Sequence, residues 1–99
     1  MLRISPELLD YLELHREDDS EIEVVFVLDP ASHRGRPQPR SVKAQAARLV
    51  KKVQAESGSK PSDWNVFGRL GAFAVRARPR FVKLMLDQDG IAGAMPNRS

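Results

Sequence analysis

The chain has 99 residues, of which 41% are hydrophobic and 29% charged, and this size and composition predict one globular domain with one core. It contains no apolar run of about 18 residues and no apolar N-terminal segment, so neither a membrane-spanning helix nor a secretory signal is expected. The absence of cysteine excludes disulfides, thiolate chemistry and cysteine-ligated zinc, and we expect a cytoplasmic location.

The net charge of +3 conceals an uneven distribution along the chain. Residues 1–29 carry nine acids and two bases, whereas residues 30–83 carry thirteen bases and two acids. This polarity predicts either that the two segments neutralise each other within the fold or that a charged partner approaches in one orientation.

The N-terminal segment predicts a short helix that ends near His15. Ser5 is a favourable cap, Pro6 suits the first helical position, and Glu7 complements the dipole of the first turn. The apolar stripe of this helix is Leu8, Leu9 and Leu12. An acidic loop follows at residues 16–20.

Residues 21–28 predict an interior strand, because they are rich in β-branched residues and their second half is apolar on both faces. Residues 31–40 contain proline and glycine and predict a loop. Ser41 then caps a helix that Gly58 ends. Its apolar positions follow a period of 3.6 residues and are Val42, Ala46, Leu49, Val50 and Val53.

Residues 63–67 predict a short strand, and residues 71–95 predict a strand, a helix and a final strand. Pro79 starts this helix and Gly90 ends it. Alternation in the two strands predicts that the bulky residues face the core and that alanines occupy the other face. The bulky residues are Phe73, Val75, Ile91 and Met95, and the alanines are Ala72, Ala74, Ala92 and Ala94.

The predicted order is a helix followed by β-α-β-β-α-β. We therefore predict an α+β domain of the ferredoxin-like type, a four-stranded antiparallel sheet with two helices on one face. One domain spans residues 1–99, with the helix and acidic loop in 1–20 and the ferredoxin-like module in 21–97. Many functions share this fold, so function has to be inferred from the surface.

No catalytic or metal-binding pattern is apparent in the sequence. His15 and His33 lie in polar segments without further ligands at suitable spacing, and the acidic residues 17–19 lack the glycine of a calcium loop. Gly68 and Gly71 precede a strand, whereas a phosphate-binding loop precedes a helix. We expect a protein that is not an enzyme and uses no cofactor or metal.

The basic middle of the chain suggests nucleic-acid binding as one function. The candidate phosphate contacts are Arg34, Arg36, Arg40, Lys43, Lys51 and Lys52. RNA-recognition sheets of this fold stack bases on exposed aromatic rings, but glycine and alanine occupy those positions around Phe73. Only electrostatic contacts to phosphates remain, and the other interpretation is a solvated helix face.

The alanine face is the other candidate site. A sheet face in water normally carries polar residues, so a small apolar face is expected to be covered. The cover is either the N-terminal helix, a partner's helices or a second copy of the chain.

Four strings in the chain look like the propeptides of subtilisin-like serine proteases and their free-standing inhibitor relatives. They are Asn65-Val-Phe-Gly, Gly71-Ala-Phe-Ala-Val, Arg80-Phe-Val-Lys-Leu and Asp89-Gly-Ile-Ala-Gly-Ala-Met-Pro-Asn97. The resemblance covers roughly residues 21–97, without the basic loop at 31–40. It implies a ferredoxin-like domain whose sheet packs on two surface helices of a protease and whose C-terminal tail lies in the substrate cleft.

Carried over to this chain, the resemblance assigns docking to Ala72, Ala74, Ala92 and Ala94, and the tail to Met95, Pro96, Asn97 and Arg98. Our leading prediction is a non-catalytic inhibitor or chaperone of a subtilisin-like serine protease. The alternatives are a basic ferredoxin-like nucleic-acid-binding domain and a self-associating assembly domain of a larger bacterial system.

Overall fold

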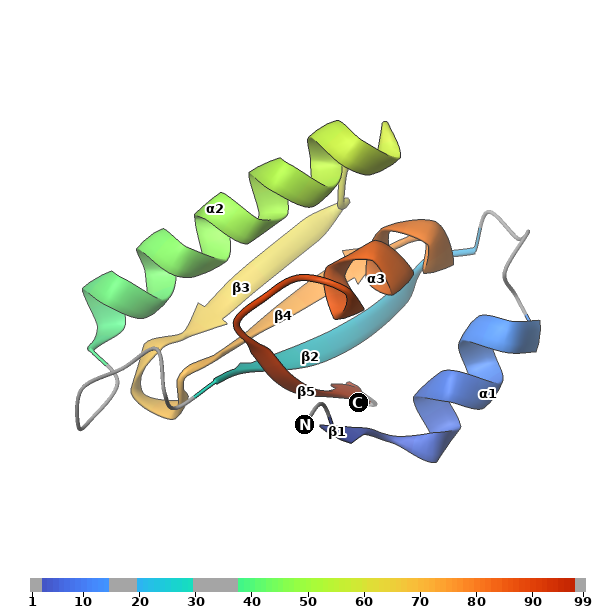
Figure 1. The fold of residues 1–99 in the computed structure, drawn as a ribbon, viewed down its shortest axis with the longest axis horizontal. Coiled ribbons are helices and arrows are strands. Elements are labelled where there is room, and N and C mark those ends of the chain that lie inside the picture. The colour runs from blue at the N-terminus through green and yellow to red at the C-terminus, as the bar shows by residue number, and fades with distance from the viewer. Residues whose placement is uncertain (1–2, 15–19, 30–37, 98–99) are drawn as a thin grey trace.

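The structure is a computed structural model that describes residues 3–14, 20–29 and 38–97. Its elements, shown in Figure 1, are β1 Arg3–Ile4, α1 Pro6–Leu14, β2 Ile22–Leu28, α2 Pro39–Ser57, β3 Asp63–Phe67, the 3-10 turn η2 Gly68–Leu70, β4 Ala72–Ala77, α3 Pro79–Leu86 and β5 Ile91–Pro96. Several predicted features lie outside the described residues: His15, the acids at 17–19, His33, Arg34, Arg36 and Arg98.

The fold is a mixed α+β domain built on one sheet with the strand order β1-β5-β2-β4-β3. Strands β2 to β5 pair in antiparallel fashion, and the two-residue β1 adds to the edge of β5 in parallel. The predicted α+β class and antiparallel sheet are confirmed, as is the interior position of β2 between β4 and β5. The pairing of β1 was not predicted, because two residues are too short to show a strand pattern.

The long helix α2 is fixed at both ends by backbone features. It starts at Pro39 with Gln38 in the cap position, so the predicted cap at Ser41 was wrong. The proline ring presets the helical φ and needs no hydrogen-bond acceptor at the first helical position. Gly68 in η2 approaches this proline so closely that an added Cβ would lie 2.7 Å from the Pro39 Cα. Gly58 ends the helix as predicted, with φ of 67° and its N–H donating to the Gln54 carbonyl at 3.1 Å.

Helix α3 starts at Pro79 as predicted but ends at Leu86, four residues before Gly90. The N–H of Asp87 donates to the Leu84 carbonyl, which tightens the last turn. The prediction that Gly90 ends the helix was therefore wrong. Gly90, at φ of 96°, instead turns the chain into β5.

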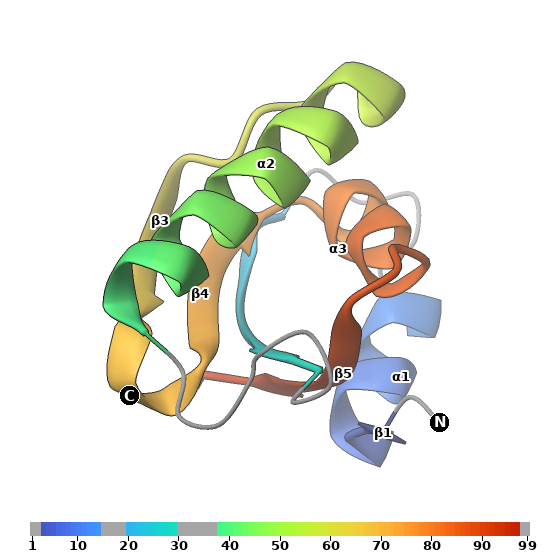
Figure 2. The same ribbon diagram turned by 60° about the vertical axis from the view of Figure 1, so that its left-hand side comes forward.

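Helices α2 and α3 cover one face of the sheet (Figures 1 and 2), and the core lies between these layers. The rings of Phe26 and Phe73 stack across β2 and β4 with centroids 5.4 Å apart. Helix α1 lies beside α3 at the β1–β5 edge, and it contributes Leu8 and Leu12 to the same core.

Candidate functional site: the open face of the sheet

The face of the sheet that points away from α2 and α3 carries two rows of residues that run across four strands. Read from β5 through β2 and β4 to β3, the rows are Met95–Val25–Ala74–Asn65 and Gly93–Val27–Ala72–Phe67. Seven of these eight residues are apolar or glycine. We call this surface the open face.

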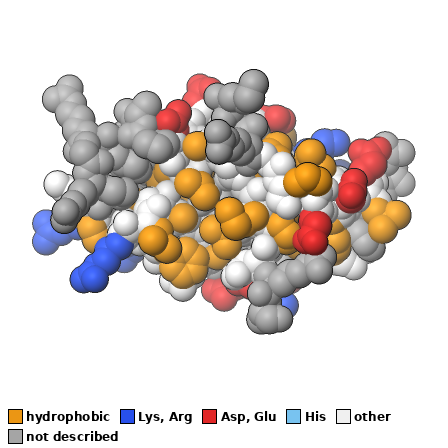
Figure 3. Space-filling view, turned by 90° about the horizontal axis from the view of Figure 1, so that it is seen from below, with side chains coloured by type: hydrophobic (Ala, Val, Ile, Leu, Met, Phe, Trp, Pro, Cys, Tyr) orange, Lys and Arg blue, Asp and Glu red, His pale blue; other side chains and the backbone are white. Residues whose placement is uncertain are grey.

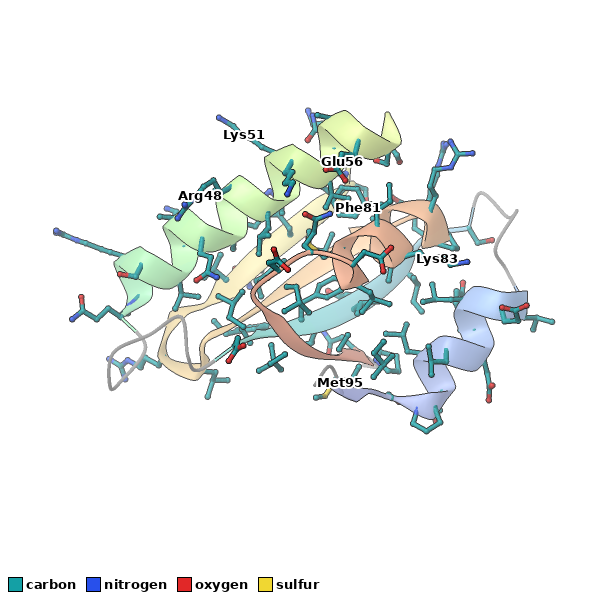
Figure 4. The ribbon with its side chains drawn as sticks, viewed as in Figure 1. Arg48, Lys51, Glu56, Phe81, Lys83 and Met95 are labelled. Carbon is teal, nitrogen blue, oxygen red and sulfur yellow. The ribbon has the colours of Figure 1, made fainter. Side chains whose placement is uncertain are left out.

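Larger side chains surround small ones on the open face. Met95 is 49% exposed, whereas Ala72 and Ala74 are only 4% and 3% exposed because Val25 and Val27 stand beside them. Met95 points away from the helices (Figure 4). Figure 3 views the molecule from below Figure 1 and shows hydrophobic side chains along the middle of the surface, with acidic side chains toward the end where α1 lies.

Charged residues border the open face at one end of the strands. Glu23, Arg76 and Asp63 form the next row, so that opposite charges stand across from each other on neighbouring strands. At the other end, Leu70 in the β3–β4 connection is 73% exposed. The row of Glu23, Arg76 and Asp63 therefore gives the apolar surface a polar boundary at its end of the strands, whereas at the other end the exposed Leu70 lies beside the exposed Arg69.

The prediction of which residues lie on which face of the sheet is correct for β4 but partly wrong for β5. Phe73 and Val75 face the core, and Ala72 and Ala74 face away from it. In β5, however, Ala94 lies opposite Phe26 in the core, and Met95 lies on the open face.

A β-bulge explains this exchange. The register shifts between Val27 and Leu28, which pair with Gly93 and Ile91, so Ala92 is an extra residue without a cross-strand partner. One extra residue moves every following side chain to the other face. Gly93 therefore joins the open face, and the half-buried Ala92 lies at the bulge.

The N-terminal helix does not cover the open face. Its leucines Leu8 and Leu12 are buried in the core shared with α2 and α3, and the Ser5 N–H donates to the Ala94 carbonyl at 3.0 Å. These contacts fix α1 at the sheet edge. Of the covers considered from the sequence, a partner protein and a second copy of the chain remain.

The predicted tail residues Met95 and Pro96 belong to β5, where they pair with Val25 and Val24. The N–H of Asn97 also donates to the Glu23 carbonyl at 2.9 Å. The chain thus stays in the sheet through Asn97. The tail role that the resemblance assigns to Met95, Pro96, Asn97 and Arg98 stays a prediction.

The predicted anion contacts Arg40, Lys43, Lys51 and Lys52 are all exposed on α2, on the side away from the sheet. Arg48 is exposed on the same helix and was missed by sequence reasoning. The 3.6-residue period that identified the apolar stripe would have placed it on this basic face.

Other features offer less for function. A hollow of about 740 Å³ lies between α3, the end of α2 and Leu12, but residues of both charges line it, Glu56 and Asp87 as well as Arg80 and Lys83. Within the described ranges, no group of three or more metal-ligating side chains comes together. No helix in that part of the chain combines the length and apolar character needed to cross a membrane.

Comparisons with protein-family models, with curated proteins and with solved structures found no significant match to this chain. The resemblance to subtilase propeptides therefore stays a prediction, and function has to be argued from the surface.

Proposed function

We propose that this chain is a non-catalytic binding module that docks a protein partner through the open face. The observation that supports the proposal is the pair of apolar rows, which the helices of the described structure leave uncovered while they bury the other face. Apolar surface in contact with water is costly, and contiguous patches of it mark interaction sites.

The shape of the open face suits a flat or helical partner surface. Four strands about 4.8 Å apart make it about 14 Å wide. Gly93, Ala72 and Ala74 carry the smallest side chains, which allows a partner's backbone or helix to approach closely. Val25, Val27 and Met95 rise beside them and supply apolar contact area.

The arrangement of elements also supports the partner class that the resemblance names. The order β5-β2-β4-β3, with α2 and α3 together on one face, is compatible with the ferredoxin-like module of a propeptide-like inhibitor or chaperone. We therefore propose a subtilisin-like serine protease as the partner. The N–H of Asn97 is bonded to β2, so a segment that inserts into the protease cleft begins after this residue. Docking of the described residues then depends on the open face.

The test is a binding titration against a subtilisin-like protease whose nucleophilic serine has been replaced by alanine, so that the chain is not digested. Ala74→Arg places a charged side chain at the centre of the open face and is expected to weaken binding at least 100-fold. The matched control is Ala55→Arg, an exposed position on α2. It is expected to bind like the natural chain.

Inhibition is then measured with the active protease and a chromogenic peptide. The proposal predicts that Ala74→Arg also loses inhibition while its circular dichroism and melting temperature stay close to those of the natural chain. Equal binding by Ala74→Arg and Ala55→Arg would refute docking through the open face. Absence of protease binding, together with a dimer in sedimentation that Ala74→Arg dissociates, would assign the face to a second copy.

A further inference from the structure

We propose that the outward face of α2 is a second binding surface, which contacts the phosphates of double-stranded DNA without reading its sequence. This surface lies on the helical side of the molecule, away from the open face, and the inference does not depend on the proposed protein partner.

The outward face of α2 is basic along most of its length. Its five exposed bases are Arg40, Lys43, Arg48, Lys51 and Lys52. At 100° per residue they fall within about half of the helix circumference, opposite the buried apolar stripe, and at 1.5 Å per residue they extend over about 18 Å. Arg48 and Lys51 project outward from the helix in Figure 4.

Among the residues that the structure describes, few acids lie near this basic face. From Pro39 to Ala55 the helix has no acidic residue. Glu56 follows in the last turn, where its carboxylate accepts a hydrogen bond from the Gln88 amide, and Asp89 lies near Arg48 and Lys52 beside α2. Two acids therefore offset five bases only in part.

The acidic N-terminal helix does not neutralise the basic face. In Figures 1 and 2, α3 lies between α1 and α2. The charge polarity seen in the sequence thus appears in the fold as two separate surfaces of opposite sign. A basic surface that is only partly neutralised attracts a polyanion.

The structure favours a nucleic acid over an anionic membrane. A basic helix that binds membranes inserts its apolar face among the lipids. The apolar face of α2 is instead buried against the sheet through Val42, Ala46 and Val53, which are 0% exposed. Only charge remains for an external partner.

A duplex fits this surface better than a single strand. Proteins that bind single strands stack the bases on aromatic side chains, and α2 carries none. A straight helix on the outside of a molecule fits the major groove of B-form DNA, where phosphates line both sides. The groove of A-form RNA is too narrow for this contact.

The experiment is a fluorescence anisotropy titration of the full chain against a labelled 16-base-pair DNA duplex at several salt concentrations. If all five bases contact phosphates, the slope of log K against log salt is about −4.5, since each contact contributes about −0.9. The double variant Arg48→Gln/Lys51→Gln should reduce the magnitude of this slope by about two. The matched control Arg80→Gln/Lys83→Gln removes the same charge from α3 and should leave the slope unchanged.

Ala74→Arg should bind the duplex as well as the natural chain, which separates this surface from the open face. The proposal fails if the natural chain does not bind the duplex at 50 mM salt. It also fails if the double variants in α2 and in α3 change the slope of log K against log salt equally. It also fails if a single strand, an RNA duplex or vesicles with anionic lipid bind more tightly than the DNA duplex. Salt-sensitive self-association that the α2 pair abolishes, without DNA binding, would identify the acidic α1 of a second copy as the partner.

Discussion

The two faces of the sheet are made by alternating residues of the same strands, yet their surroundings differ completely. Val24 and Val75 lie under the helices and are fully buried, whereas their neighbour Val25 is only partly buried on the open face. Both faces are apolar, so residue type alone does not distinguish them. What distinguishes them is the helical layer, which covers one face and leaves the other to a partner.

The exposed fraction of a residue does not identify its face either. Ala74 and Ala94 are both 3% exposed, but Ala74 belongs to the open face and Ala94 faces the core. A short side chain is hidden by its neighbours on either face. The two positions differ once a longer side chain replaces the alanine, because such a side chain can extend into water from position 74 but enters the core from position 94.

Replacing these two alanines by arginine gives the largest expected difference. Ala94→Arg forces a charge into the core opposite Phe26 and should reduce the free energy of unfolding by about 3–5 kcal/mol. In Ala74→Arg the guanidinium extends into water, and the loss should stay within about 1 kcal/mol. Urea unfolding followed by the fluorescence of Trp64, the only tryptophan, measures both. Equal losses would mean that the open face is also an interior surface.

The same two alanines show how far the sequence predicts this fold. Alternation placed Ala74 correctly, because β4 pairs with both neighbours without interruption. It misplaced Ala94, because the bulge at Ala92 is set by the pairing register between β5 and β2. The residues of β5 alone carry no sequence pattern that predicts this bulge. The α+β class and the basic helix follow from local periodicity. The edge position of α1 is a tertiary contact that periodicity does not specify.

A methionine pair tests the comparison with a smaller effect. Met85 on α3 is fully buried in the core, whereas Met95 is half exposed on the open face. Met85→Ala leaves a cavity and should cost about 2–5 kcal/mol. Met95→Ala removes a side chain that already contacts water, so the cost should be about 0.5 kcal/mol or less. A larger cost for Met95→Ala than for Met85→Ala, measured by the same urea titration, would contradict the assigned register of β5.

The finest test uses two adjacent valines of β2, Val24 under the helices and Val25 on the open face. Threonine has nearly the same shape and the same β-branch, so the change to threonine replaces one methyl group by a hydroxyl at nearly constant volume. Val24→Thr buries this hydroxyl and should cost about 1–3 kcal/mol, whereas Val25→Thr exposes it to water and should change stability by less than about 0.5 kcal/mol. Because strand and substitution are shared, the difference reports only which face is covered. If Val25→Thr costs as much as Val24→Thr, the open face is covered in solution, and an unfolding midpoint that rises with protein concentration would identify a second copy as the cover.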